Sequence, residues 1–236
     1  MVKKELRKLK MQERDGLSEE QLQKLSSVIT DKIIGLDEYK NADTILTFVS
    51  CRSEVRTDNL IEYSLKCGKR VGVPKVEGDI IRFYEIQSLE DLEPGYFGVR
   101  EPKIYRPQNL ENLETGYFGV LEPKIYTHQS EQNTGLGDYK KLFDSNERMI
   151  NQDAEISTEL DPEGAFMIVP GLVFDRKLNR IGYGKGFYDR YFDTNQTKSF
   201  TKCGIAFDQQ MCEGIDTDPR DVPLDMLVTE SEVISR

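Results

Sequence analysis

Short apolar segments alternate with helical ones in the first part of this chain, and this order constrains its fold more than any other feature. Ile45–Val49 and Arg70–Val73 are apolar runs typical of buried strands, and Ile80–Ile86 has the alternating character of a third. Between the first two, Thr57 is placed to cap a helix that runs to about Cys67 and ends at Gly68. This order indicates an α/β fold with a central, mostly parallel sheet flanked by helices in three layers.

Further elements fit the same plan. Val2–Arg14 is expected to form a short helix with a cationic face, and Ser18 with Gln21 forms a capping box ahead of a helical pattern that stops at Gly35. Pro74 is expected to close the second strand. Later strands are expected at Ala165–Val169, Cys203–Phe207 and Met226–Thr229.

The middle of the chain holds a tandem duplication, because Leu89–Tyr105 is nearly copied as Leu110–Tyr126. Two copies are too few for a solenoid, so residues 89–126 are interpreted as a duplicated loop, of which at most one copy fills a given place in the fold. Residues 129–163, approximately, are polar with weak periodicity and are predicted to be a surface insertion. We expect residues 1–236 to form a single domain that carries both features.

Composition excludes several classes of protein. The formal net charge of −10 argues against nucleic-acid binding, which depends on clustered Lys and Arg. No apolar stretch approaches the roughly 18 residues of a membrane span, and the N-terminus lacks the apolar run of a signal peptide, so a cytoplasmic protein without membrane contact is expected. The four cysteines form no Cys-x-x-Cys pair and only one histidine is present, which disfavours a zinc site.

A Gly-rich segment, Arg180–Asp189, follows the expected strand Ala165–Val169. Its three alternating glycines allow backbone amides to approach a phosphate closely, and the helix expected from Phe187 would point its N-terminus at the same anion. Arg180 and Lys185 add positive charge. The spacing fits neither the Walker A loop nor the dinucleotide fingerprint, and by itself it leaves a plain turn equally open.

Three other charged residues have two interpretations each. Asp189 either complements the dipole of that helix or reaches a magnesium ion held by phosphates. Lys3 and Arg7 share a helix face, which is either a solvated end or a cationic arm over a nucleotide. Because ligands collect beyond the carboxyl ends of parallel strands, Cys51–Arg56, which includes Glu54, is expected to line one crevice with the Gly-rich segment.

These motifs, taken in order, resemble those of the 5-formyltetrahydrofolate cyclo-ligases, also called methenyltetrahydrofolate synthetases. The most specific part is Val169–Asp175 followed by Asn179–Arg190. Weaker parts are Lys3-x-x-x-Arg7, Ser50-x-x-x-Glu54-Val-x-Thr57, Gly-x-x-Gly-Val-x-Glu-Pro, Gly204–Phe207 with Gln210, and Asp221-x-x-x-Asp225 with Thr229. The resemblance covers nearly the whole chain except the second copy and the insertion.

The resemblance implies a Mg²⁺-dependent enzyme that converts ATP and 5-formyltetrahydrofolate to 5,10-methenyltetrahydrofolate, ADP and phosphate through a phosphorylated formyl group. It implies that Asp189 and Asp221 hold the metal, and that Lys185 and Arg180 are catalytic. The implied ATP-binding residues are Lys3, Arg7, Arg180, Ile181, Gly182, Tyr183, Gly184, Lys185, Gly186, Phe187 and Tyr188. The implied folate-binding residues are Cys51, Glu54, Arg56, Phe118, Tyr183, Gly184, Lys185, Gly186 and Phe187.

Two departures leave alternatives open. Arg56 stands where relatives can carry an acidic residue, so a kinase or ligase for another small molecule is one alternative, and a folate-binding relative without turnover is another. The duplication leaves Phe97 or Phe118 to face the folate, and Phe118 is favoured because its copy continues toward the next strand. The size of the chain favours a monomer.

Overall fold

A computed structural model describes residues 2–95, 98–103, 113–115, 121–123, 158–218 and 220–236. The chain divides into two units, Met1–Lys103 with Thr158–Arg236, and Ile104–Ser157. The second unit contains the second copy of the duplication and most of the predicted insertion. Of these, only a two-stranded hairpin, β6 (Leu113–Thr115) with β7 (Leu121–Pro123), lies within the described residues.

The expected sheet is present. It has seven strands in the order β14-β13-β11-β8-β1-β2-β3, of which the five inner strands run parallel and the two edge strands are antiparallel. The prediction of a mostly parallel α/β sheet is therefore confirmed. The strands are β1 (Thr44–Leu46), β2 (Arg70–Glu77), β3 (Ile80–Ile86), β8 (Phe166–Val169), β11 (Thr201–Ile205), β13 (Met226–Val228) and β14 (Val233–Ser235).

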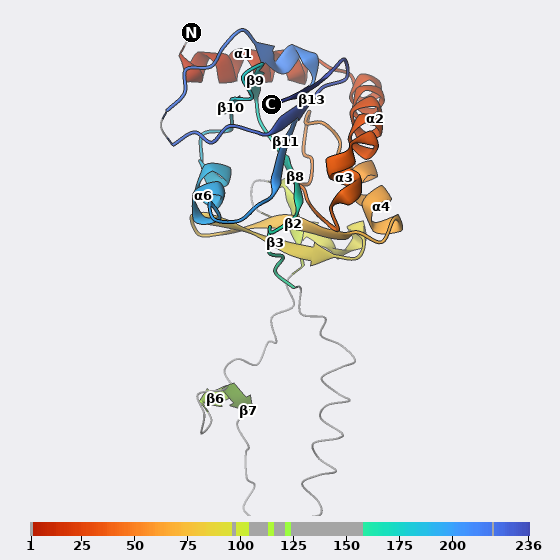
Figure 1. The fold of residues 1–236 in the computed structure, drawn as a ribbon, viewed down its shortest axis with the longest axis vertical. Helices are drawn as coiled ribbons and strands as arrows, with labels where there is room; N and C mark the ends of the chain where they lie inside the picture. The colour runs from red at the N-terminus through yellow and green to blue at the C-terminus, as the bar shows by residue number, and fades with distance from the viewer. Residues whose placement is uncertain (1, 96–97, 104–112, 116–120, 124–157, 219) are drawn as a thin grey trace, which may run out of the picture. The chain divides into compact units, whose positions relative to one another are not determined.

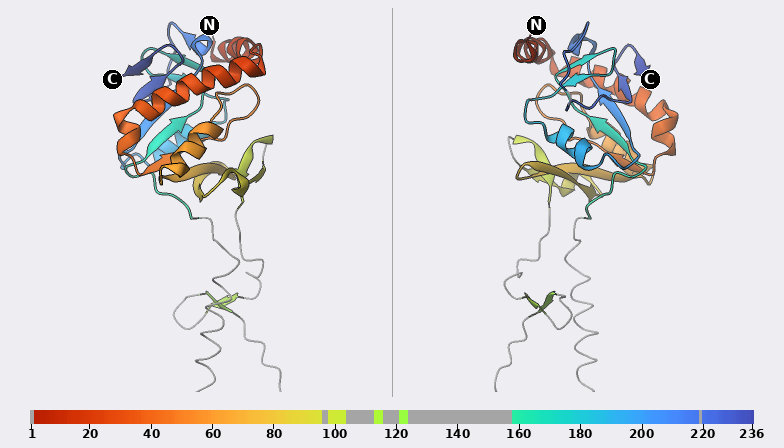
Figure 2. Two further views of the ribbon diagram at one scale, coloured as in Figure 1. Left: turned by 90° about the vertical axis from the view of Figure 1, so that its right-hand side faces the viewer. Right: turned by 60° about the vertical axis from the view of Figure 1, so that its left-hand side comes forward.

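Helices cover both faces of this sheet (Figures 1 and 2). On one face lie α2 (Glu19–Gly35), α3 (Asp37–Asn41) and α4 (Asp58–Lys66), and on the other lies α6 (Phe187–Thr194). Strand side chains alternate between the two cores: Ile45 and Phe166 pack beneath α2, whereas Leu46 and Met167 pack on the side of α6. This double coverage explains why the central strand β8, Phe166–Val169, is apolar and buried along its whole length.

A smaller sheet supports the N-terminal helix. It consists of β9 (Val173–Asp175), β10 (Arg180–Ile181) and β12 (Met211–Cys212). Helix α1 (Lys3–Asp15) packs on it through Leu6 and Met11. These short strands carry too few residues to show periodicity in the sequence, and they were not predicted. Their effect is to place α1 beside the Gly-rich segment, which begins within β10.

Two local predictions need correction. Pro74 does not close β2, which continues to Glu77. The pairing of β2 with β1 ends at Gly72, so β1 requires no backbone N–H from Pro74. Thr57 does precede α4, but its side chain makes no cap hydrogen bond. Instead its hydroxyl donates to the Phe48 carbonyl and accepts from the Ser50 amide. These two hydrogen bonds fix the position of the segment after β1.

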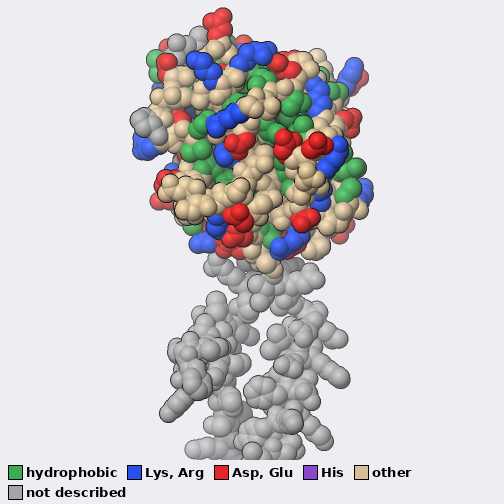
Figure 3. Space-filling view, in the orientation of Figure 1, with side chains coloured by type: hydrophobic (Ala, Val, Ile, Leu, Met, Phe, Trp, Pro, Cys, Tyr) green, Lys and Arg blue, Asp and Glu red, His purple; other side chains and the backbone are tan. Residues whose placement is uncertain are grey.

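The acidic net charge does not form one patch on the face seen in Figure 3, where acidic and basic side chains are interspersed. Many are paired, as in Arg70 with Glu85 and Arg82 with Glu159, both at 2.8 Å. Among the described helices, none is long and apolar enough to cross a membrane.

Candidate functional site

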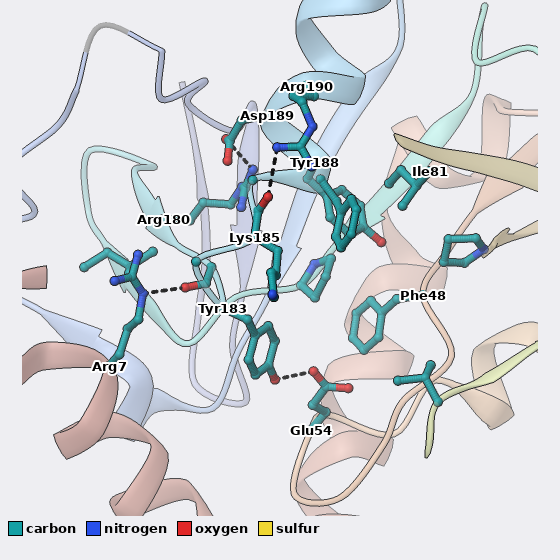
Figure 4. A pocket seen from close by; sticks show the side chains of 18 of the residues that line it. Arg7, Phe48, Glu54, Ile81, Arg180, Tyr183, Lys185, Tyr188, Asp189 and Arg190 are labelled. Carbon is teal, nitrogen blue, oxygen red and sulfur yellow. Dashed lines mark hydrogen bonds and ion pairs between the residues drawn. The ribbon is translucent and has the colours of Figure 1, made fainter. Parts of the chain in front are cut away.

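A cavity of about 1010 Å³ opens beyond the carboxyl ends of β1 and β8, where ligands are expected in a parallel sheet. It is bounded by the Gly-rich loop between β10 and α6, by α1, and by the segment after β1. Arg7 and Arg180 enter from one side, and Glu54, Phe48 and Ile81 from the other (Figure 4). The cavity therefore has one wall that carries Arg7 and Arg180, the cationic wall, and an opposite wall in which apolar side chains such as Phe48 and Ile81 lie beside Glu54.

The backbone of the Gly-rich loop explains its glycines. Gly184 has φ 92° and Gly186 has φ 67°, conformations that side chains other than glycine rarely adopt. Gly186 is also the N-cap of α6 and provides no capping side chain. The first N–H groups of that helix are thus available to an acceptor in the cavity, as the phosphate interpretation of the segment requires.

Arg180 lies at the centre of the cationic wall. Its side chain is 5% exposed and donates to Asp189 at 2.6 Å, and its guanidinium lies 5.5 Å from the ring centroid of Phe192. Burial lowers its pKa, and Asp189 opposes this effect. Among the described residues, neither the Arg180 Nε nor the hydroxyl of the adjacent Tyr188 has a hydrogen-bond partner. Buried polar groups are rarely left unsatisfied, which makes these two atoms candidate contacts for a ligand.

The two predicted metal ligands, Asp189 and Asp221, both line the cavity, and each is paired with a cation. Asp189 accepts from Arg180, and Asp221 accepts from Lys3 at 2.5 Å. Across the residues that the structure describes, no cluster of three or more His, Cys, Asp or Glu could hold a metal without other ligands. Two carboxylates beside the Gly-rich loop are compatible with magnesium, which usually takes one or two carboxylates plus phosphate oxygens, and the metal site stays a prediction.

Helix α1 contacts the Gly-rich loop along one face. Lys3 reaches Asp221, and Arg7 donates from Nε to the Gly182 carbonyl at 2.8 Å. Both contacts show that this end of the helix is not simply solvated, while its binding of a nucleotide stays a prediction. Arg14 was missed: it is 3% exposed and donates to the Tyr183 hydroxyl at 3.0 Å. Its spacing of seven residues from Arg7 places both on one helix face, which was the available signal.

The opposite wall centres on Glu54, which is 7% exposed. This carboxylate accepts from the Cys51 amide at 2.9 Å and from the Tyr183 hydroxyl. Burial, with a smaller effect from Glu54, raises the pKa of the Cys51 thiol to about 11. Burial and Glu54 likewise raise the pKa of Tyr183. The structure thus brings Cys51, Glu54 and Tyr183 together, as the sequence predicted.

The structure does not support one predicted folate contact, Arg56, and does not test another, Phe97 or Phe118. Arg56 is not part of the cavity lining, because its guanidinium donates to Glu19 of α2 at 2.7 Å and to the Arg52 carbonyl at 2.5 Å. The expectation that it faces the substrate is not supported. Phe97 and Phe118 both lie outside the described residues, so the choice between them stays a prediction.

The first copy of the duplication nevertheless borders the cavity. It forms a hairpin of β4 (Leu92–Pro94) and β5 (Arg100–Pro102), and Val99 and Glu101 line the space. The remaining predicted ATP residues, from Ile181 to Tyr188, line it as well.

Comparison with known proteins agrees with this geometry. The sequence model of the 5-formyltetrahydrofolate cyclo-ligase family matches residues 1–138 and 119–230. A probable 5-formyltetrahydrofolate cyclo-ligase from Schizosaccharomyces pombe is 28% identical over 87% of this chain and 84% of its own length, and the mouse 5-formyltetrahydrofolate cyclo-ligase is 27% identical over 93% and 89%. The solved structure of Aquifex aeolicus 5,10-methenyltetrahydrofolate synthetase superposes with a TM-score of 0.69 at 28% identity, and covers 100% of this chain and 93% of that chain.

Proposed function

Because this chain belongs to the 5-formyltetrahydrofolate cyclo-ligase family, we propose that it uses ATP to close 5-formyltetrahydrofolate into 5,10-methenyltetrahydrofolate, with release of ADP and phosphate. The observation that carries the proposal is that the Gly-rich loop and Glu54 face one cavity of about 1010 Å³. This volume lies at the upper end of the usual range for ligand pockets, about 300–1,000 Å³.

The reaction needs activation because the oxygen of a formamide is a poor leaving group. Transfer of the γ-phosphoryl group breaks its bond to ADP and forms a bond to the formyl oxygen. N10 of the folate then attacks the formyl carbon, the carbon–oxygen bond breaks, phosphate leaves with that oxygen, and N10 loses its proton. The protein forms no covalent bond in this scheme, so its tasks are positioning and charge stabilisation.

The Gly-rich loop would hold the ATP phosphates. The amides at the start of α6 can donate to phosphate oxygens, and Arg180 has a buried Nε whose hydrogen bond such an oxygen would complete. Lys185 and Arg7 would add positive charge from the loop and from α1. We assign the catalytic roles to Lys185 and Arg180, because charge on the transferring group must be stabilised where it develops.

Asp189 and Asp221 would hold a magnesium ion together with those phosphates. The ion would supply neutralisation of phosphate charge. In the protein alone, Arg180 and Lys3 neutralise the same two carboxylates. With both carboxylates engaged by a metal, Arg180 and Lys3 would be available to the phosphate oxygens.

The folate would lie against Phe48 with its polar ring edge toward Glu54. A carboxylate offers about four acceptor positions, and Glu54 uses two of them, for Tyr183 and for the Cys51 amide. It can therefore still accept from N–H groups of a pterin. Tyr183 comes from the Gly-rich loop and touches Glu54, so it lies where the two ligands would meet.

The test is turnover measured as the near-UV absorbance of the methenyl product, with and without Mg²⁺ and ATP. Product should form only when both are present, and Lys185→Met should lower kcat at least about a hundredfold, the usual loss when one charge-stabilising donor is removed. Folded protein that binds 5-formyltetrahydrofolate but produces no methenyl form would contradict the proposal. ADP release that does not depend on folate would instead indicate a kinase or ligase for another substrate.

A further inference from the structure

Within the described residues, each copy of the duplication contains one pair of antiparallel strands. β4 pairs with β5 through Leu92 with Pro102 and Glu93 with Glu101, and β6 pairs with β7 in the same register twenty-one residues later. Over the seventeen residues of each copy, the sequences differ at three positions only: Asp91 against Asn112, Pro94 against Thr115, and Arg100 against Leu121. Two nearly identical hairpins are therefore available for one place in the fold.

The first copy is packed into the sheet beside the cavity. Leu92 belongs to the core cluster formed with Val71 and Ile86. Lys75 of β2 donates to the Pro102 carbonyl at 3.2 Å and lies 3.9 Å from Glu93. The second copy has the same residues at these positions, so these contacts do not favour either copy.

Two of the three differences do favour the first copy. Arg100 pairs with Asp58 at the start of α4, at 2.6 Å, whereas the second copy has a leucine there. Asp91 accepts from the amides of Gln87 and Ser88, at 2.7 and 2.9 Å. An asparagine in its place would accept without charge, and hydrogen bonds to charged acceptors are roughly twice as strong. The third difference, Pro94, is exposed.

We propose that the first copy forms the wall of the folate cavity, that Arg100 is the positioning residue that holds it against α4, and that the second copy is not required for turnover. Arg100 acts indirectly: its neighbours Val99 and Glu101 line the cavity, and its own side chain points to Asp58. The inference rests on the proposed function, because the affinity for folate is one of its readouts.

Two deletions of equal length test it. Removal of residues 106–126 keeps the first copy, and removal of residues 89–109 keeps the second, so the two shortened chains differ only at the three positions named above. The chain with the first copy should keep the KM for 5-formyltetrahydrofolate of the full protein within twofold. The chain with the second copy should have a KM about two- to fivefold higher, the range for loss of one partly exposed ion pair.

A restoring variant separates Arg100 from the other differences. Leu121→Arg in the chain that keeps only the second copy should bring KM back toward the value of the full protein. In the full chain, Arg100→Leu should raise KM, and this variant does not depend on the folding of a shortened chain. Equal KM values in both deletions, or a lower KM with the second copy, would overturn the role of Arg100; loss of turnover in both folded deletions would show that both copies are needed.

Thermal unfolding tests the same packing without the reaction. The chain with the first copy should unfold about 1–4 °C above the chain with the second. If the full protein shows no turnover, the proposed function fails, but the order of the two unfolding temperatures still decides whether the first copy is the better fit.

Discussion

Arg14 connects three parts of the site, and its replacement tests whether α1 shapes the cavity. Its guanidinium donates to Ser53 at 3.1 Å and to Tyr183 at 3.0 Å, and it lies 5.8 Å from the centroid of the Tyr183 ring. Hydrogen bonds from a charged group contribute about 1.5–3 kcal/mol each. In Arg14→Met, Ser53 keeps its bond to Asp15 and Tyr183 keeps its bond to Glu54, so neither hydroxyl is left unsatisfied. We therefore expect a total loss of about 2–3 kcal/mol.

This loss should divide between folding and substrate binding. About 2 kcal/mol lost from folding would lower the Tm by roughly 4–8 °C for a chain of this size. About 1 kcal/mol lost from binding would raise the KM for the folate about fivefold. The change in kcat should be smaller, because Arg14 contacts Ser53 and Tyr183 and would not touch the transferring phosphate. Steady-state kinetics and thermal unfolding measure both quantities.

Lys8→Met is the matched control, since Lys8 is exposed on the same helix and is absent from the cavity lining. It should change neither the Tm by more than about 1 °C nor the KM by more than about twofold, as is usual for surface substitutions. If Arg14→Met behaves like this control, the contacts of α1 do not shape the folate side of the cavity and the reasoning is refuted.

Three further predictions concern packing, reactivity and metal binding. Gly204→Ala would place a methyl group 2.5 Å from Leu224, so chemical denaturation should show that the free energy of unfolding falls by about 1–3 kcal/mol. An unchanged denaturation midpoint would mean that the core accommodates the methyl group without loss of stability. Burial and Glu54 raise the pKa of the Cys51 thiol to about 11, so this thiol should react slowly with iodoacetamide at pH 7 and faster as the pH rises toward 11. Mass spectrometry of the labelled peptide measures the rate, and fast labelling at pH 7 would contradict the burial argument. Asp221→Asn should raise the magnesium concentration for half-maximal turnover by about tenfold, and an unchanged magnesium titration would remove this residue from the metal site.

Local patterns predicted most of the sheet and its covering helices. The capping box of Ser18 and Gln21 is present, with both hydrogen bonds formed, and β3 spans the predicted Ile80–Ile86. The Gly-rich loop was also predictable, because its glycines and the apolar pattern of α6 act within a few residues of one another. Such features depend on neighbours in sequence, which a single chain displays directly.

Other features depend on partners distant in the sequence. Whether Arg56 turns toward the cavity or away from it was decided by Glu19, thirty-seven residues earlier. Pro74 fits within β2 because the pairing of β2 with β1 ends at Gly72, two residues earlier. The role of Arg14 needed Tyr183, 169 residues later, to be recognised. Local sequence does not encode which of these distant groups meet.

The contacts of α1 also bear on when the site forms during synthesis. Lys3 binds Asp221, Arg7 binds Gly182, and Lys10 donates to the Gln209 carbonyl at 2.7 Å. Helix α1 leaves the ribosome long before any of these partners has been translated. These contacts can therefore all be present only after the chain has been synthesised as far as Asp221, so a nascent chain that has already assembled β1 and β2 still lacks a complete cationic wall.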